Sequence, residues 1–278
     1  MTILAIQKMG GFCPAGTLRE LFLLLENSQP LEGEVMAGEC NAAGLKQSPR
    51  MPSGPLLRRV PRLAKIALRA ALDAVDWPSG LEALIISAFY GSVTSTFEFL
   101  DSILNDGADL ASPTAFSHTV TNMTTAFVSQ YLKITGPCLT LTQPLLTPSL
   151  EAAWALLSGG QVTNVLWGAV SERSSDMAAI EKLSARQPVT LTDGAVFFEL
   201  CLPNPHHQEI LVEFGSQESS GFEPSPYGDL VFGSGSLALA FRLALTSLLA
   251  EKSSDRSLSQ VVSDGRERLV ISLSRSGL

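Results

Sequence analysis

Short apolar runs of strand length alternate along this chain with longer segments in which apolar residues recur every three or four positions. Residues 84–87, 165–168 and 195–202 are runs of the first kind, and residues 58–75 are a segment of the second, whereas residues 234–250 are a long apolar segment of helix length. The first pattern is typical of buried strands and the second of helices with one apolar face. The chain is therefore predicted to be an α/β protein.

The clearest pattern begins at residue 113. Apolar residues recur there at intervals of three and four positions, which predicts a single helix with one apolar face. Gly136 and Pro137 follow and end the helix. The apolar residues of this helix are Phe116, Val120, Met123, Phe127 and Tyr131.

A strand, a turn and a second helix are predicted directly afterwards. Residues 139–142 alternate as in a strand, and a turn containing prolines comes next. Ser149 is the expected N-cap of a helix over residues 150–157, and a glycine pair ends that helix.

The other predicted elements complete the order along the chain. They are a first strand at 3–6, a turn at Gly10-Gly11, a helix at 17–26, a long surface loop at 27–55, a helix at 96–104, strands at 195–202 and 209–215 that are hairpin neighbours, and a last strand at 268–274.

Composition narrows the class of protein. The 278 residues are 45% hydrophobic, enough for a large core, and the formal charge of −8 argues against a general nucleic-acid binder. No apolar run reaches membrane-spanning length, and the N-terminus lacks a signal-peptide pattern. The four cysteines show neither zinc spacing nor a disulfide framework. We expect a soluble, cytoplasmic protein without a bound metal.

One predicted helix, at residues 58–75, is rich in cations. They form either a solvated helix face or a docking patch for an acidic carrier protein. The cations are Arg58, Arg59, Arg62, Lys65 and Arg69.

Three stretches together resemble the β-ketoacyl synthases of the thiolase-like group. The first holds Ser112, Pro113, Phe116 and Asn122, the second is Thr135-Gly136-Pro137, and the third is the run at 159–172. The resemblance implies a thiolase-like fold with mixed sheets covered by helices. It implies one domain over residues 1–278, with a complete N-terminal half at 1–215 and an abridged C-terminal half at 216–278.

The same resemblance locates the catalytic positions of the family, and this chain lacks the residues that they need. The nucleophilic cysteine falls on Gln143 or Leu145, depending on the register, and chain-length factors carry glutamine there. One catalytic histidine falls on Asp229, in the run 228–237, and the segment of the other histidine is missing. A carboxylate has the wrong charge to stabilise an enolate. The resemblance thus implies no catalytic residues and no cofactor.

A non-catalytic chain-length factor is the function that the resemblance implies. It would form a heterodimer with an active β-ketoacyl synthase in a type II polyketide or fatty acid pathway, of the aryl polyene kind, and meet the acyl-phosphopantetheine of the carrier protein through that partner. The strand Leu139, Thr140, Leu141 and Thr142 would pair with the partner's strand. The residues near the partner's acyl tunnel would be Phe116, Thr119, Asn122, Met123 and Phe127.

Two alternatives remain open. One is a stand-alone acyltransferase or 3-oxoacyl-ACP synthase, with a nucleophile from Cys138, Thr142, Thr147 or Ser149. The other is a structural homodimer without a tunnel. The histidines favour neither, because His118 is expected to pack against its surroundings and His206-His207 has Glu209 nearby but no third metal ligand.

Overall fold

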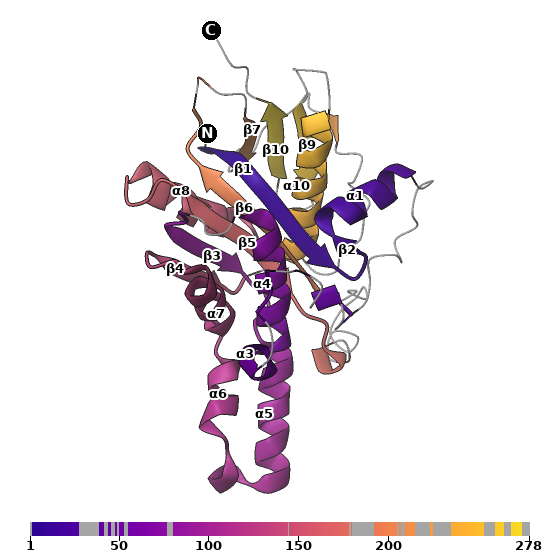
Figure 1. Cartoon of the computed structure of the whole chain (residues 1–278), viewed down its shortest axis with the longest axis vertical. Helices are drawn as coiled ribbons and strands as arrows, with labels where there is room; N and C mark the ends of the chain where they lie inside the picture. Colours follow the sequence, from indigo (N-terminus) through magenta and orange to yellow (C-terminus); the bar gives the residue numbers. More distant parts are fainter. Residues whose placement is uncertain are drawn as a thin grey trace.

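The strands of the chain form one mixed sheet. The computed structural model describes residues 2–27, 39–41, 44–45, 48, 50–52, 55–76, 80–143, 145–177, 179, 192–204, 206, 209–214, 223–224, 235–252, 259–263 and 268–273. Within these residues the sheet has ten strands, in the order β4-β3-β5-β6-β1-β7-β10-β9-β8, and β2 pairs with β1 beside this path (Figure 1).

The bounds of the elements follow the predicted alternation. The strands are β1 Thr2–Cys13, β2 Gly16–Thr17, β3 Ala83–Ser87, β4 Cys138–Leu141, β5 Val165–Ser171, β6 Gly194–Cys201, β7 Ile210–Phe214, β8 Glu223–Pro224, β9 Ser259–Ser263 and β10 Arg268–Leu273. The helices are α1 Leu18–Asn27, α3 Pro55–Arg58, α4 Arg62–Ala74, α5 Val93–Asp106, η1 Ala108–Leu110, α6 Pro113–Thr119, α7 Met123–Leu132, α8 Thr147–Ser158 and α10 Gly235–Lys252.

Both faces of the sheet are covered by helices. Along β5, Val165, Trp167 and Ala169 point into one apolar cluster, whereas Leu166 and Val170 point into the other. Helices α1, α8 and α10 supply the first cluster, and α4 and α7 supply the second. This three-layer arrangement explains why the strands are apolar on both faces.

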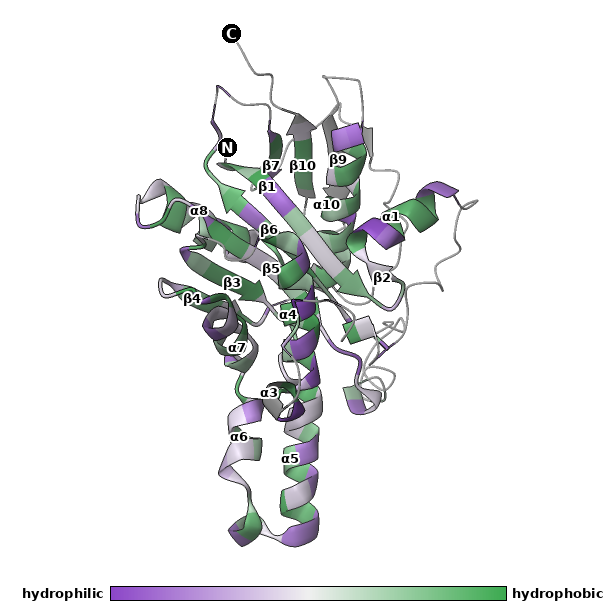
Figure 2. Ribbon diagram, viewed as in Figure 1, coloured by the Kyte–Doolittle hydropathy of each residue, from purple (hydrophilic) through white to green (hydrophobic). Residues whose placement is uncertain are grey.

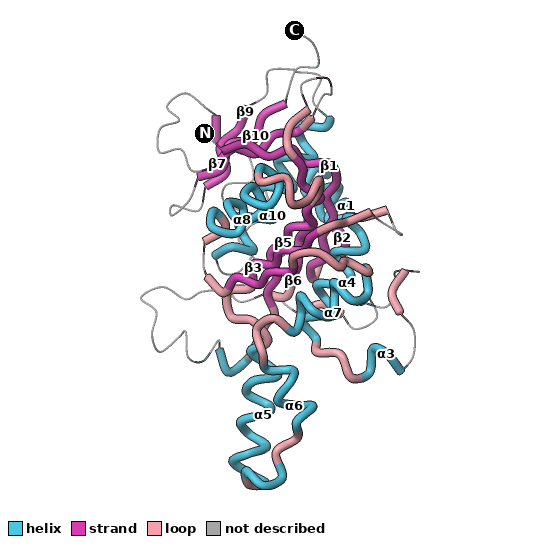
Figure 3. Tube along the Cα trace, turned by 90° about the vertical axis from the view of Figure 1, so that its left-hand side faces the viewer, coloured by secondary structure: helices cyan, strands magenta, loops and turns pink. Residues whose placement is uncertain are grey.

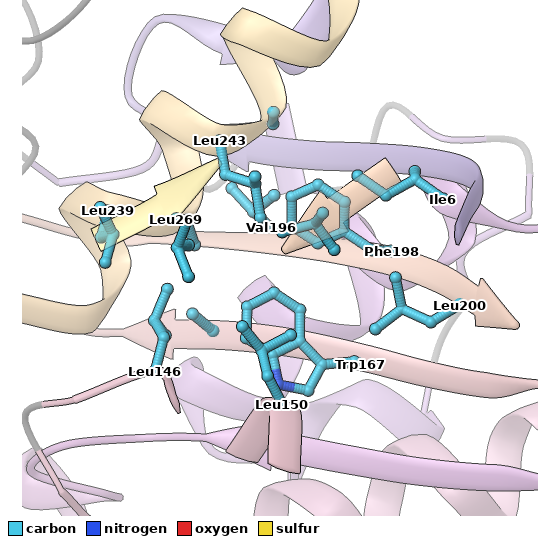
Figure 4. Packing of buried hydrophobic residues seen from close by; sticks show 14 of the residues in the cluster. Ile6, Leu146, Leu150, Trp167, Val196, Phe198, Leu200, Leu239, Leu243 and Leu269 are labelled. Atoms are coloured by element: carbon cyan, nitrogen blue, oxygen red, sulfur yellow. The ribbon is translucent and has the colours of Figure 1, made fainter. Parts of the chain in front are cut away.

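The first cluster is centred on large aromatic side chains. Trp167 and Phe198 are fully buried, and their ring centroids lie 5.4 Å apart. Leu150 of α8 and Leu243 of α10 also belong to this cluster, so the two helices share one core with the sheet (Figure 4).

The predicted turn at Gly10-Gly11 is wrong. Both glycines lie inside β1, which pairs with β6 through this region. A Cβ on Gly10 would overlap the backbone of Asp73 and Ala74 in α4. Glycine is therefore required because a helix packs directly against the strand backbone, and no turn is formed.

The single helix predicted at 116–131 is also wrong. The chain forms α6 and α7 instead, and between them Val120 takes an extended conformation with φ −69° and ψ 138°. Ser112 caps α6 by accepting a hydrogen bond from the backbone N–H of Ala115. The apolar spacing continues across this break, which is why periodicity alone did not show it.

Two further boundaries and one strand pairing differ from prediction. The basic helix starts at Arg62, after the separate short helix α3. The N-cap of α8 is Leu146, and Ser149 lies within its first turn. The strands β6 and β7 are not hairpin neighbours, because β1 lies between them and pairs with both. The sheet also gains β8 and β9, which the sequence pattern did not indicate.

Helices α5 and α6 form an arm that projects from the body of the molecule (Figures 1 and 3). The two helices are held together by contacts such as that between Phe99 and Phe116, whose ring centroids lie 5.7 Å apart. Green apolar residues alternate with purple polar ones along α5 of the arm (Figure 2). Among the described residues, no helix is long and apolar enough to cross a membrane.

Candidate functional site

Several strands end along one side of the sheet, at right angles to the lateral edge formed by β4; this row of strand ends is the edge described first. β1, β3, β4 and β5 run in the same direction, and the antiparallel β6 begins at this edge, with Gly194 opposite Ser171. In α/β sheets, ligands bind beyond the carboxyl ends of parallel strands. This edge is therefore where a site is expected.

The turn between β4 and α8 lies at this edge. Gln143 and Leu145, the two residues that the resemblance assigns to the nucleophile position, are both half-buried in this turn. Cys138 lies at the opposite end of β4, about 15 Å from the turn at the usual rise per strand residue. The turn thus presents no thiol to the N-terminus of α8.

Ser149 has a structural role. Its hydroxyl is buried and donates a hydrogen bond of 2.7 Å to the carbonyl oxygen of Leu146. It also accepts a bond of 2.8 Å from the indole Nε1 of Trp167. These bonds fasten the first turn of α8 to β5, so the hydroxyl is not free to attack a thioester.

Asp193, directly before β6, is the centre of a buried polar network. Its carboxylate accepts hydrogen bonds from the backbone N–H of Cys40 (2.6 Å) and of Arg173 (2.8 Å). The guanidinium of Arg62 also donates to it. Burial raises the pKa of Asp193, and these donors oppose that rise. The network joins α4, the chain at Cys40 and the ends of β5 and β6.

Glu172 lies beside this network, directly after β5. It is 3% exposed, and its Oε1 accepts a 3.0 Å hydrogen bond from the backbone N–H of Thr94, in the first turn of α5. The carboxylate therefore serves as a cap for α5 from another part of the chain, because Ser92 makes no side-chain cap bond. Burial raises the pKa of Glu172 to about 7, with a further contribution from Asp193.

Four buried hydroxyls border the same edge. Ser87 ends β3, Ser92 precedes α5, and Thr94 and Thr124 lie in the first turns of α5 and α7; none has a hydrogen-bond partner within the described structure. The edge therefore offers carboxylates and hydroxyls. The described histidines lie elsewhere, His118 on α6 of the arm and His206 in the turn after β6 at the opposite edge.

The predicted tunnel residues follow one another along α6 and α7. Phe116 is 55% exposed and Asn122 is also exposed, whereas Thr119, Met123 and Phe127 are half-buried. Helix α7 packs on β4, where the hydroxyls of Thr125 and Thr140 lie 2.6 Å apart. The structure therefore places α7, with Met123 and Phe127, beside the predicted interface strand, whereas Phe116 and Thr119 lie on α6 of the arm.

β4 is the last strand of the sheet. Its inner edge pairs with β3, and no described strand pairs with its outer edge. Cys138, Leu139 and Thr142 are exposed, and Thr140 and Leu141 are half-buried. The residues predicted to pair with a partner thus lie on a sheet edge with free backbone groups.

The basic helix does not present a continuous cationic face. Arg69 is buried, with its guanidinium 5.2 Å from the ring centroid of Phe12, and Arg62 is engaged by Asp193. Arg58 and Arg59 remain exposed. Arg69 therefore belongs neither to a solvated helix face nor to a docking patch, the two alternatives for this helix, because α4 packs against β1 on that side.

The buried thiols are not suited to nucleophilic chemistry. Burial raises the pKa of Cys13 to about 12 and also raises that of Cys40, so both remain protonated near neutral pH. In the described part of the chain, no three His, Cys, Asp or Glu side chains are arranged to hold a metal ion. Asp229 and His207 lie outside the described residues.

The family model for the β-ketoacyl synthase N-terminal domain matches residues 38–177 of the chain. The chain belongs to the β-ketoacyl synthase family. No curated protein sequence matches this family member closely enough to count as a relative.

Solved structures confirm the fold of this β-ketoacyl synthase family member. A chain of the ishigamide ketosynthase/chain length factor superposes with a TM-score of 0.69 at 15% identity, covering 100% of both chains. A chain from the ketosynthase ApeO in complex with its chain length factor ApeC, from Xenorhabdus doucetiae, gives 0.66 at 16% identity and covers 98% of this chain and 99% of that one. The predicted thiolase-like α/β fold is thereby confirmed.

Sequence reasoning missed the network around Asp193 and Glu172. Arg62 was expected on a helix face, Asp193 in a polar connection, and Glu172 at a strand end, with nothing to join them. The available signal was that each carboxyl group adjoins a strongly apolar strand. Acids at strand ends in a sheet buried on both faces require partners.

Proposed function

We propose that this chain is a non-catalytic ketosynthase-like subunit, a chain-length factor. It pairs with an active β-ketoacyl-ACP synthase and shapes the acyl tunnel of that enzyme in a type II polyketide or fatty acid pathway of the aryl polyene kind. The carrier protein, with its acyl-phosphopantetheine, reaches the pair through the active partner.

The observation that carries this proposal is the turn between β4 and α8. A ketosynthase nucleophile needs a thiolate at the N-terminus of a helix, where the dipole and backbone amides stabilise negative charge. The turn offers Gln143 and Leu145, and neither can form a thioester. Ser149 is engaged by Leu146 and Trp167. On this proposal the chain keeps the fold of the family, and Gln143 or Leu145 replaces the nucleophilic cysteine.

Two further observations support a partner. β4 leaves one strand edge unpaired among the described residues, and Leu139 on that strand is 40% exposed. A second chain adding its own strand would satisfy these backbone groups. In solved structures of similar fold, a ketosynthase occurs in complex with its chain length factor.

A single domain over residues 1–278 is part of the proposal. Its complete half spans 1–215 and its abridged half spans 216–278. Support comes from the sheet, in which β10 pairs with β7 and β7 pairs with β1. The helix α10 shares the first core cluster with α8 and β5.

The proposed function is tested by intact mass and by co-purification. Incubated with an acyl-ACP or acyl-CoA donor, the purified chain is expected to show no covalent adduct by intact mass. In a separate experiment, it is expected to co-purify with an active ketosynthase encoded beside it. A stable acyl adduct on the isolated chain would establish an acyltransferase instead. A stable homodimer with no affinity for the ketosynthase would establish a structural scaffold.

Met123→Ala and Phe116→Ala are expected to lengthen the product of the reconstituted pair. Large side chains at the end of a tunnel limit chain length, because compressing an acyl chain into filled volume costs roughly 1–3 kcal/mol. Phe116 is 55% exposed in the isolated chain, so it is not there to fill the core. Mass spectrometry of the products measures the shift.

Phe127→Ala tests how far this effect extends along α7, because Phe127 is half-buried and packs against the second core cluster. An unchanged product distribution in all three variants, with the complex intact by gel filtration, would show that these residues do not form the end of the tunnel.

A further inference from the structure

Arg69 of α4 is a buried cation with unused hydrogen-bond donors. Its side chain is 10% exposed, and its Nε–H has no partner within the described structure. Its guanidinium lies 3.9 Å from the carboxylate of Asp73, which is too long for a hydrogen bond, and 5.2 Å from the ring centroid of Phe12. A guanidinium carries five N–H donors, and a buried donor without an acceptor is costly. Arg69 therefore calls for an acceptor that the described residues do not supply.

A cavity of about 310 Å³ lies beside Arg69, between the C-terminal part of α4 and the chain at residues 48–50. Arg50, Asp73 and Asp76 also line it. Its volume is at the lower end of the range for small-molecule sites, which begins at roughly 300 Å³. The cavity thus has room for a small ligand.

Arg50 is a second cation held at this cavity. Its Nη1 donates to the carbonyl oxygens of Leu72 (3.3 Å) and Val75 (2.8 Å), at the C-terminal end of α4. Its own carbonyl oxygen accepts a 2.8 Å hydrogen bond from the hydroxyl of Tyr131. These partners are uncharged, and no carboxylate of the described residues lies within ion-pair distance of Arg50. The guanidinium is therefore fixed in place while its charge is uncompensated.

The two carboxylates of the cavity do not neutralise both arginines. Asp76 lies 2.6 Å from the Nζ of Lys8, with which it forms an ion pair. Asp73 accepts a 3.4 Å hydrogen bond from the backbone N–H of Gly11, and burial raises its pKa against the opposing effect of Arg69. Positive charge therefore remains at the cavity.

Arg69 also borders a second cavity, of about 250 Å³, which is less suited to an anion. Among the described residues that line it, Arg69 is the one cation and Glu20 is a carboxylate. The backbone N–H and the hydroxyl of Thr17 donate to Glu20, at 2.7 and 2.9 Å, and these bonds lower its pKa. An ionised Glu20 repels an anion, so the cavity shared with Arg50 is the better site.

We propose that the cavity between Arg50 and Arg69 binds a small oxyanion, which is the carboxylate or phosphate group of a small-molecule ligand. Guanidinium groups suit such ligands because their donors form a fork that matches two oxygens of a carboxylate or phosphate. The site shares no residue with the turn between β4 and α8. The inference therefore goes beyond the proposed function and does not depend on it.

Thermal unfolding of the full chain tests this site, with sodium phosphate or sodium acetate added and sodium chloride at equal ionic strength as the reference. The wild type is expected to show a saturable rise of its midpoint with at least one of the two anions, with a dissociation constant on the order of 1 mM. Arg69→Met removes the charge and the donors, and it is expected to weaken this binding about tenfold. The matched control is Arg59→Met, which removes an exposed cation before α4 and should bind as the wild type does.

Asp73→Asn is expected to act in the opposite direction. It removes a competing negative charge, and its amide oxygen can still accept from the backbone N–H of Gly11. Binding should tighten about threefold. This variant decides the inference if Arg69→Met does not fold, because an unchanged affinity would overturn it.

Two other results would also overturn the inference. One is a rise of the wild-type midpoint that does not saturate with either anion, and the other is an equal affinity in Arg69→Met and the wild type. If the site binds, tighter binding of phosphate than of acetate identifies a phosphate ligand, and the reverse order identifies a carboxylate.

Discussion

Glu172→Gln is expected to make the protein more stable above neutral pH. It is also expected to reduce the change of the unfolding free energy with pH. Burial raises the pKa of Glu172 from 4.5 to about 7, so the fold favours the protonated carboxyl group. The stability that this group contributes is complete below pH 4.5 and is lost as pH rises through 7. Between pH 5.5 and 8.5 the free energy of unfolding of the wild type should fall by about 2 kcal/mol relative to that of the glutamine variant.

Chemical denaturation at several pH values measures this difference. Glutamine keeps an oxygen that can accept the hydrogen bond from the backbone N–H of Thr94, so the comparison isolates the buried charge. The groups that face Glu172 are Asp193, which raises its pKa, and Arg62, which lowers it, and both remain in the variant. Glu151→Gln, on the exposed surface of α8, should follow the wild type. Parallel stability curves for wild type and Glu172→Gln would show that the carboxyl group is not held at a raised pKa.

Gly10→Ala is expected to cost roughly 3 kcal/mol of unfolding free energy. The added Cβ would overlap the backbone of Asp73 and Ala74, and a helix backbone cannot rotate away as a flexible side chain can. Either α4 moves off β1 or the strand bends, and both changes disturb the second core cluster.

Urea unfolding followed by circular dichroism measures this cost. Gly80→Ala is the matched control, because nothing lies within 4 Å of its Cβ position, and it should change stability by less than about 0.5 kcal/mol. If the two variants had the same midpoint, direct packing of α4 on the backbone of β1 would be excluded.

Local pattern predicted most elements because each buried strand has its own apolar run. β3, β5 and β6 were found in this way, as were α1, α8 and α10, within a few residues of their bounds. Local pattern was wrong where a distant segment decides the conformation. Gly10 suggests a turn until α4 is placed against it, and the 116–131 spacing suggests one helix until the arm leads back to the body at Val120.

The candidate site was likewise predicted only in part from the sequence. The absence of a cysteine between residues 139 and 149 is a property of the sequence, and the resemblance located that gap. The partnership of Asp193 with Arg62, and of Glu172 with Thr94, joins residues far apart along the chain. No spacing rule could have paired them.

The sequence by itself determined the α/β class, the family resemblance and the absence of a cysteine from residues 139–149, because these depend on which residues stand where along the chain. Only the tertiary structure decided that β4 is an edge strand, that an arm formed by α5 and α6 projects from the body, and that a buried glutamate caps α5. The physical reason is that burial, edge exposure and charge compensation depend on which distant segments come together. A residue's neighbours in sequence do not set these quantities.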